Sequence, residues 1–133
     1  MTVVDTNILV HACDQRQPHL QEIAQKLLRN TSDLVILWQV ACEFIAASRK
    51  LQAQGFEPSR AREYLSALLE VFPLVLPTRA QFDRATLLMI ENQVSFWDAL
   101  TIAACLENGA TCLYSADLPG QHIKGLEILN PFA

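Results

Sequence analysis

The sequence has no long hydrophobic run. Its longest apolar stretches, residues 34–38 and 71–76, are far shorter than the roughly 20 residues that a membrane-spanning helix needs. The first five residues include an acid and no lysine or arginine, which does not suit a signal peptide. We therefore expect a cytoplasmic protein without a membrane segment.

Cysteine and histidine are few, and none is spaced like a zinc ligand. The four cysteines form no Cys-x-x-Cys pair, and the three histidines supply no pair beside them. We expect reduced thiols, most of them buried as small apolar side chains. The cysteines are Cys13, Cys42, Cys105 and Cys112.

Positive charge is also in deficit. The chain has 10 basic and 14 acidic residues, and this formal charge of −4 argues against holding nucleic acid by a basic surface alone.

The sequence has no linker rich in Gly, Ser or Pro and no repeat. We expect one domain over residues 1–133, long enough to bury about two-thirds of the unfolded surface in a single core.

Short apolar runs alternate with amphipathic stretches along the chain. The runs predict buried strands at residues 3–4, 34–37, 74–76, 111–114 and 126–129. The stretches between them predict helices at residues 19–28, 40–51, 58–69, 78–89 and 96–106, the last two beginning with capping-box spacing. This alternation is typical of an α/β fold with a mainly parallel sheet of about five strands and helices on both faces.

Four acidic residues interrupt apolar sequence instead of lying on a polar face. They are Asp5, Glu43, Asp98 and Asp117. Asp5 and Asp117 follow the first and fourth predicted strands, whose carboxyl ends open into the same crevice of a parallel sheet. We expect Glu43 and Asp98 in the first turns of helices that follow loops on that side.

Carboxylates gathered this closely need a positive partner. Each pair would repel by roughly 4 kcal/mol at about 4 Å and an effective dielectric of about 20. Without these four acids the chain would have 10 acidic and 10 basic residues, so they account for the whole formal charge of −4. Hard oxygen ligands favour Mg²⁺ or Mn²⁺ over zinc. Basic side chains are expected instead on exterior helices, at Arg49, Lys50, Arg60, Arg62, Arg79 and Arg84.

Each acid also has an ordinary structural explanation when it is taken alone. Asp5 suits a turn or a helix N-cap, and Glu43 suits a solvated helical position. Asp98 suits a capping box with Ser95, and Asp117 suits a loop. The metal site therefore depends on the four converging in space.

Four segments resemble the motifs of the PIN-domain nucleases, and within them the VapC-like toxins of type II toxin-antitoxin systems. Residues 3–9 resemble the opening motif, in which a strand delivers the first acid, and residues 39–44 resemble the segment with the family's glutamate. Residues 96–100, Phe-Trp-Asp-Ala-Leu, are similar to the third motif, and residues 113–118, Leu-Tyr-Ser-Ala-Asp-Leu, to the fourth. The segments stand in family order.

The resemblance implies a PIN-like three-layer α/β/α fold and a Mg²⁺- or Mn²⁺-dependent endoribonuclease. Its catalytic and metal-binding residues would be Asp5, Glu43, Asp98 and Asp117. Because Mg²⁺ keeps several waters, Asp5 and Asp98 are our choice for the innermost ligands. The residues expected to orient ligands or water, although a turn-forming role explains them equally well, are Thr6, Asn7 and Ser115. Some relatives carry a further acid near the third or fourth motif, where this chain has Ala99 and Ala116, which leaves one ion or two open.

The resemblance also implies an RNA substrate, a cognate antitoxin that blocks the acidic crevice, and a homodimer. The predicted helices 58–69 and 78–89 carry enough apolar residues to leave some for an interface. The basic residues that could contact RNA, although a solvated face explains each of them better, are Arg49, Lys50, Arg79 and Arg84. Trp38 and Trp97 are expected in the core rather than as stacking platforms for bases.

Two other functions stay open from the sequence. Asp5-x-Asn7 superficially resembles the nucleophile loop of haloacid dehalogenase phosphotransferases, but Asn7 stands where that chemistry needs a second acid, and lysine is scarce. The non-enzymatic alternative is a PIN-like module that binds RNA or a partner protein without cutting.

Overall fold

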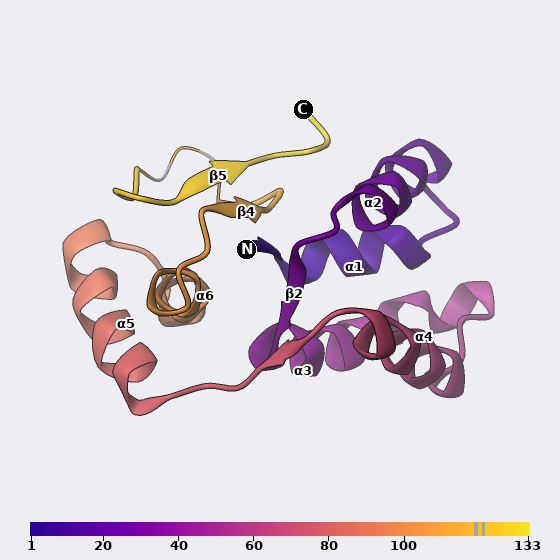
Figure 1. Ribbon diagram of the computed structural model, residues 1–133. Coiled ribbons are helices and arrows are strands. Elements are labelled where there is room, and N and C mark those ends of the chain that lie inside the picture. The colour runs from indigo at the N-terminus through magenta and orange to yellow at the C-terminus, as the bar shows by residue number, and fades with distance from the viewer. Residues whose placement is uncertain (119, 121) are drawn as a thin grey trace.

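The computed structural model describes residues 1–118, 120 and 122–133, and these residues build one parallel sheet between two helical layers (Figure 1). The strands of this sheet lie in the order β3-β2-β1-β4-β5. Their bounds are β1 (Thr2–Val4), β2 (Leu34–Leu37), β3 (Leu74–Val75), β4 (Cys112–Tyr114) and β5 (Glu127–Leu129). All neighbouring strands pair in parallel. The predicted α/β fold with a parallel sheet of about five strands is confirmed.

Helices cover both faces of the sheet. They are α1 (Thr6–Cys13), α2 (Pro18–Asn30), α3 (Trp38–Ala47), the 3-10 helix η1 (Ser48–Gln54), α4 (Pro58–Val71), α5 (Arg79–Asn92) and α6 (Phe96–Glu107). Figure 1 shows α1, α2 and α4 on one side of the sheet and α5 and α6 on the other. Among the helices in the described ranges, none has the length and hydropathy of a membrane span.

The central strands owe their formation to burial on both faces. Val3, Val4 and Ile36 are 0 or 1% exposed, as expected for parallel strands covered by helices on either side. Their side chains join Ile8 of α1 and Phe44 of α3 in the main core. The continuous apolar runs that predicted these strands reflect this double coverage.

Helix α6 is buried in its second half, and small residues bring α5 close to it. Residues 101–105 are buried, as the apolar sequence predicted. Ala85 of α5 and Ala99 and Ala103 of α6 form a second, smaller core between the two helices. Alanine at these positions permits a close approach of the helix backbones.

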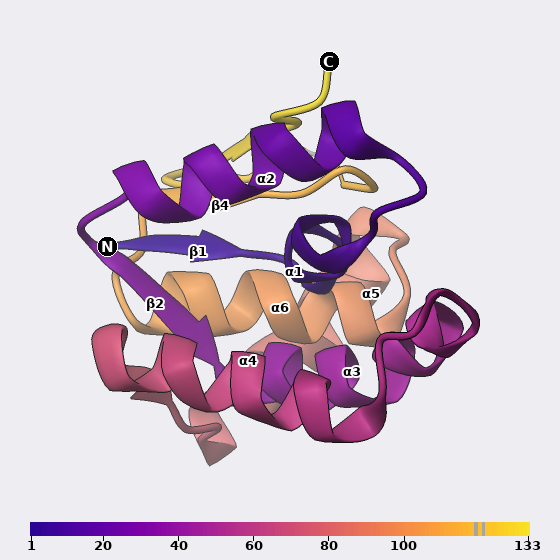
Figure 2. The ribbon, with the colours of Figure 1, turned by 90° about the vertical axis from the view of Figure 1, so that its right-hand side faces the viewer.

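Helix α1 is the element that the sequence pattern did not predict. It begins immediately after β1, as Figure 2 shows, and the Asp5 side chain caps it by accepting a hydrogen bond from the Thr6 N–H. Ile8, Leu9 and Ala12 turn toward the core. A helix of eight residues spans only two turns, so its periodicity is hard to distinguish from a turn followed by a short apolar run.

The predicted helix at residues 40–51 consists of two elements. Helix α3 follows β2 directly, and η1 then extends to Gln54. Gly55 ends η1 with a φ of 86°, a left-handed conformation that glycine adopts without steric cost. This continuous α3–η1 rod forms one wall of the site described below.

The cysteines agree only partly with the predicted burial. Cys13 and Cys105 are buried, and burial raises the pKa of each to about 12, so both thiols stay protonated. Cys112 is half-buried and Cys42 is exposed on α3. The apolar neighbours of Cys42 in sequence misled the prediction, because on a helix its side chain faces away from theirs.

Candidate active site

A cleft lies at the carboxyl edge of the sheet, beside β1. The chain proceeds outward from β1 to β2 and β3 and then returns to β4 on the other side of β1, so β1 and β4 flank a topological switch point. Asp5 follows β1, and Ser115 to Asp117 follow β4. The cleft has a volume of about 260 Å³, and its lining includes all four predicted acids, Asp5, Glu43, Asp98 and Asp117.

Asp5 is held at both oxygens. The Thr6 N–H donates to Oδ1 at 2.8 Å, and the buried Ser115 hydroxyl donates to Oδ2 at 2.9 Å. The Asp5 N–H itself donates to the Tyr114 carbonyl at 2.8 Å. The end of β1 and the end of β4 are therefore joined through the Asp5 carboxylate and backbone.

Asn7 connects α1 to the loop that carries Asp117. Its amide Nδ2 donates to Asp117 Oδ2 at 3.0 Å, and its Oδ1 accepts from the Ala116 N–H at 3.3 Å. The Ser115 hydroxyl accepts from the Asp117 N–H at 3.2 Å. These bonds fix the Asp117 carboxylate relative to Asp5, which lies 112 positions earlier in the chain.

Glu43 is oriented by two polar neighbours. The Thr6 hydroxyl donates to Glu43 Oε2 at 3.3 Å, and the Gln39 amide donates to Oε1. The same amide donates to the Trp97 carbonyl at 3.1 Å, which links α3 to the start of α6. Glu43 stands in the second turn of α3, and α3 follows β2 without a loop. The expected position in a first turn after a loop is wrong, because the chain turns directly from strand into helix at Leu37.

Asp98 stands in the first turn of α6, as predicted. Its N–H donates to the Ser95 hydroxyl at 3.1 Å, so Ser95 is the N-cap. In the described part of the chain, no hydrogen bond reaches the Asp98 carboxylate, and the return bond of a full capping box is not formed. This carboxylate lines the cleft with its oxygens free to bind another group.

The cleft concentrates negative charge without a compensating ion pair. Burial raises the pKa of Asp5, the bonds from Ser115 and Thr6 oppose this, and the charges of Glu43 and Asp98 raise it further. Among the described residues, none of the four acids lies within 4.0 Å of a basic nitrogen. The ionised form of Asp5 is therefore disfavoured in the protein alone, and a cation in the cleft would relieve this cost.

The donor set fits a hard divalent cation in chemistry. Carboxylates supply the oxygens that Mg²⁺ and Mn²⁺ prefer, and their hydrogen bonds hold them in place. With the side chains as they lie, no three His, Cys, Asp or Glu side chains in the described ranges are close enough to hold a metal directly. Mg²⁺ keeps several water ligands and needs only one or two direct carboxylates, so this spacing is compatible with it.

Several residues at the cleft were not predicted to lie there. Lys50 and His11 line it, and Gln39 holds Glu43. His11 packs edge-on against Phe132 at 4.7 Å, and its Nδ1 is buried without a hydrogen-bond partner among the described atoms. Helical spacing could have predicted both positions, because residues four apart lie on the same face of a helix. Gln39 precedes Glu43 by four residues, and His11 follows Asn7 by four.

The expectation that both tryptophans lie in the core is wrong. Trp38 is 47% exposed and Trp97 is 65% exposed. Each is the first residue of a helix that carries a cleft acid, α3 for Trp38 and α6 for Trp97. First-turn residues project beyond the packed part of the helix, so hydrophobicity alone did not indicate their environment.

The fold and the site together define an α/β protein with an acidic cleft at the switch point of a parallel sheet. The PIN domain family matches residues 2–119 of the chain. The chain therefore belongs to the PIN domain family. No curated protein matches it.

Solved structures share the fold over nearly the whole chain. They include a toxin-antitoxin complex from Klebsiella pneumoniae, with 19% identity, a TM-score of 0.72 and 98% of each chain covered. FitAcB from Neisseria gonorrhoeae is 14% identical with a TM-score of 0.76, and 99% of each chain is covered. A Sarcin-Ricin loop cleaving VapC toxin from Mycobacterium tuberculosis is 19% identical with a TM-score of 0.69, covering 90% of this chain and 92% of that one. At these identities the likeness shows the fold alone.

Proposed function

We propose that this protein is a Mg²⁺- or Mn²⁺-dependent endoribonuclease and the toxin of a toxin-antitoxin pair. One observation carries the proposal: four acids from separate segments of the chain line one cleft, and none has an ion-pair partner among the described residues. Membership of the PIN domain family supports it, as do structural neighbours described as toxins or toxin-antitoxin complexes.

The residues of the cleft divide the work of hydrolysing a phosphodiester. A bound divalent ion lowers the pKa of its water and stabilises charge on the scissile phosphate. Asp5 and Asp98 would be the innermost ligands, because Asp5 is held rigidly and no described hydrogen bond competes for the Asp98 carboxylate. Glu43 and Asp117, oriented by Gln39 and Asn7, would hold the water ligands of the ion through their remaining lone pairs.

Digestion of total cellular RNA by the purified protein tests this proposal. We expect cleavage with Mg²⁺ or Mn²⁺, none with EDTA, and none with Asp98→Asn. The matched control is Asp83→Asn, since Asp83 is an exposed acid of α5 that pairs with Arg79 away from the cleft. Cleavage that resists EDTA, or full activity in Asp98→Asn, contradicts the proposal.

RNA binding and phosphate labelling, measured alongside the digestion, distinguish the two alternative functions. Protein that binds RNA in Mn²⁺ but leaves every RNA whole would favour a non-cleaving PIN-like module. Phosphate label that stays on the protein in acid would favour the phosphotransferase with Asp5 as nucleophile. The hydrogen bonds from Ser115 and Thr6 to both oxygens of Asp5 argue against a free nucleophile at this position.

We also propose a cognate antitoxin and a homodimer. Structural neighbours include toxin-antitoxin complexes, and an antitoxin that covers the acidic cleft would block RNA from it. Helix α5 exposes Phe82, Leu87 and Ile90, an apolar surface suited to a second copy of the chain. Co-expression with the neighbouring reading frame tests the antitoxin, which should co-purify with this protein and suppress its cleavage of RNA.

A further inference from the structure

A lysine stands in the acidic cleft. In the part of the chain that the structure describes, Lys50 is the single lysine or arginine in the cleft lining. It is exposed, and it forms no ion pair with a described carboxylate within 4.0 Å. Because the Lys50 ammonium lies beside the four acids without pairing with any of them, it is available to bind another anion.

The other basic residues that the sequence offered for RNA contacts are occupied or lie elsewhere. Arg79 pairs with Asp83 at 3.2 Å along α5, and Arg84 pairs with Glu107 at 3.0 Å between α5 and α6. Arg49, the residue before Lys50, lines a different hollow beside Phe56. The structure thus singles out Lys50 from candidates that were equivalent in sequence.

Lys50 continues the wall that carries Glu43. Glu43 and Ala47 of α3 and Lys50 of η1 all line the cleft along one side of the α3–η1 rod. A rise of about 1.5 Å per α-helical and about 2.0 Å per 3-10 residue puts Lys50 roughly 12 Å beyond Glu43 along the axis. At this separation Lys50 lies beside the place where the acids would hold a scissile phosphate, rather than in it.

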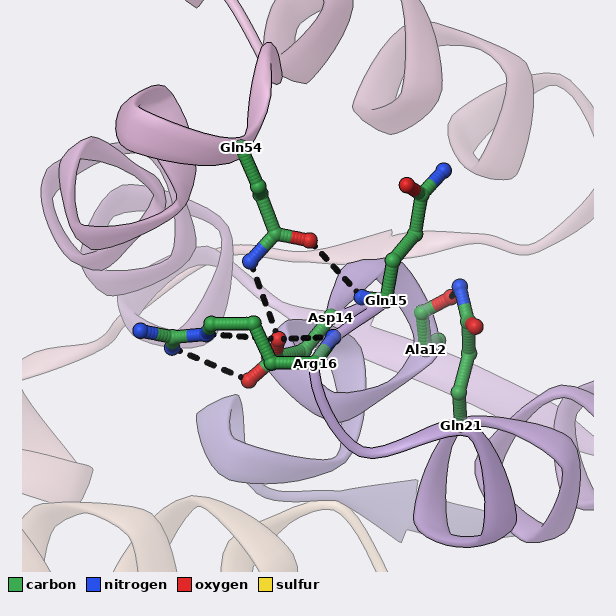
Figure 3. A network of polar contacts seen from close by, with 6 residues as sticks. All are labelled: Ala12, Asp14, Gln15, Arg16, Gln21 and Gln54. Carbon is green, nitrogen blue, oxygen red and sulfur yellow. Dashed lines mark hydrogen bonds and ion pairs between the residues drawn. The ribbon is translucent and has the colours of Figure 1, made fainter.

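Hydrogen bonds fix η1 in this position. Gln54, at the end of η1, donates from Nε2 to Asp14 Oδ1 at 3.0 Å and accepts from the Gln15 N–H at 2.8 Å (Figure 3). Arg16 holds the buried Asp14 through Nε at 3.0 Å and Nη2 at 3.1 Å. The network joins η1 to the end of α1, the helix that carries Asn7, so the 3-10 helix that bears Lys50 is tied to another helix lining the cleft.

We propose that Lys50 binds a phosphate of the RNA backbone next to the scissile phosphate. This inference rests on the proposed ribonuclease function. The acids of the cleft repel a polyanion, and a compact ammonium on a long stem is a suitable point contact for a phosphate beside them. Lys50 thereby sets how a single strand lies along the cleft.

The test measures RNA binding separately from cleavage. A fluorescently labelled single-stranded RNA is titrated in EDTA with wild-type protein, Lys50→Gln, Lys50→Arg and the neighbouring control Arg49→Gln, between 50 and 200 mM salt. Lys50→Gln should raise Kd about tenfold at low salt. It should also reduce the slope of log K against log salt by about 0.7, the value for one phosphate contact on a single strand. Lys50→Arg should retain most of the affinity, and Arg49→Gln should match wild type.

Steady-state cleavage in Mn²⁺ supplies the second readout. Lys50→Gln should raise KM with little change in kcat, because the contact is made before and during the reaction alike. An unchanged Kd and salt slope in Lys50→Gln overturns the inference, as does an equal loss in Arg49→Gln. A lower Tm or altered Mn²⁺ affinity with unchanged RNA binding would instead identify Lys50 as a counter-ion for the acids.

The outcomes distinguish this inference from the proposed function. Wild-type protein that binds RNA through Lys50 but never cuts it contradicts the ribonuclease and leaves the phosphate contact standing. Wild-type protein that cuts RNA while Lys50→Gln binds and cuts it equally well contradicts the contact alone. Wild-type protein that neither binds RNA in EDTA at 50 mM salt nor cleaves it in Mn²⁺ overturns both.

Discussion

Asp5 is a residue whose local environment opposes its own charge. Burial and the neighbouring charges of Glu43 and Asp98 raise its pKa. Asp5→Asn should therefore abolish cleavage and leave the metal-free protein as stable as wild type or up to about 1 kcal/mol more stable. Asparagine keeps an oxygen for the Thr6 N–H, so the cap of α1 survives. Thermal melting in EDTA and an RNA digest check this; a fully active variant contradicts the role of Asp5.

The surroundings of Asp14 stabilise its charged form, in contrast to those of Asp5. The Arg16 guanidinium holds the pKa of this buried carboxyl well below its usual range, with a further bond from Gln54. A pKa that is lower in the folded state adds stability above the unfolded value of about 3.9 and loses it as the pH falls toward the folded value. Asp14→Asn should thus cost about 1–3 kcal/mol at pH 7.

Urea denaturation at pH 7, 5 and 3 measures this effect. The stability difference between wild type and Asp14→Asn should be equal at pH 7 and 5 and smaller at pH 3. A difference that stays constant down to pH 3 means that the Asp14 charge contributes nothing and that packing alone explains the loss.

Residue identities in the cleft were predictable where each acid interrupts an apolar run. Asp5 and Asp98 are such cases, and the structure places both in the cleft. Lys50 was one of four equivalent basic candidates in the sequence, because a lysine in a polar helix segment is normally solvated and only the packing of η1 brings it to the cleft. Their roles in metal and RNA binding stay predictions.

Among the helices, removing the N-cap of α5 or of α6 tests whether cleavage depends on the position of Asp98 or only on overall stability. Ser95 caps α6, which carries Asp98, and Thr78 caps α5, which carries no cleft acid. Ser95→Ala and Thr78→Ala should each cost about 1 kcal/mol of stability, because each leaves an N–H of the first turn without its partner. Only Ser95→Ala should also slow RNA cleavage, since it frees the first turn that positions Asp98.

Matched melting curves and cleavage rates for the two variants check this prediction. Equal loss of activity in both would mean that cleavage follows global stability rather than the position of Asp98. Ser95→Asp restores an acceptor at the cap and should recover most of the stability.

The elements themselves were largely predictable because their signals are local. Buried parallel strands such as β2 read as continuous apolar runs, and α6 begins at a recognisable cap. Helix α1 escaped because it is short and starts directly at a strand end. The division between α3 and η1 escaped because both present the same apolar spacing, and only the hydrogen-bond pattern separates them.

At the scale of the whole molecule, an exposed apolar surface on α5 predicts self-association. Ile90 is 70% exposed and Leu87 is 59% exposed. If this surface forms the homodimer, Ile90→Asp should weaken association at least about 30-fold, equivalent to about 2 kcal/mol. Sedimentation velocity over a range of protein concentrations measures it. Val71→Asp, an exposed position on α4, is the matched control, and a dimer that survives Ile90→Asp places the interface elsewhere.

The location of the site follows from topology. The strand order places the ends of β1 and β4 side by side, and acids that follow those two strands must meet there. Sequence indicates which residues follow strands, but not which side of β1 each later strand joins. The contacts that depend on this choice, such as Asn7 with Asp117, became visible only in the structure.

The proposed function requires that Asp5 and Asp98 together bind a divalent cation in the cleft. Calorimetric titration of Mn²⁺ into the purified protein tests it most directly. We predict saturable binding to wild type and to Asp83→Asn, and its loss in both Asp5→Asn and Asp98→Asn. Wild-type protein that binds no Mn²⁺, or variants that bind it as tightly as wild type, would contradict a metal site formed by Asp5 and Asp98.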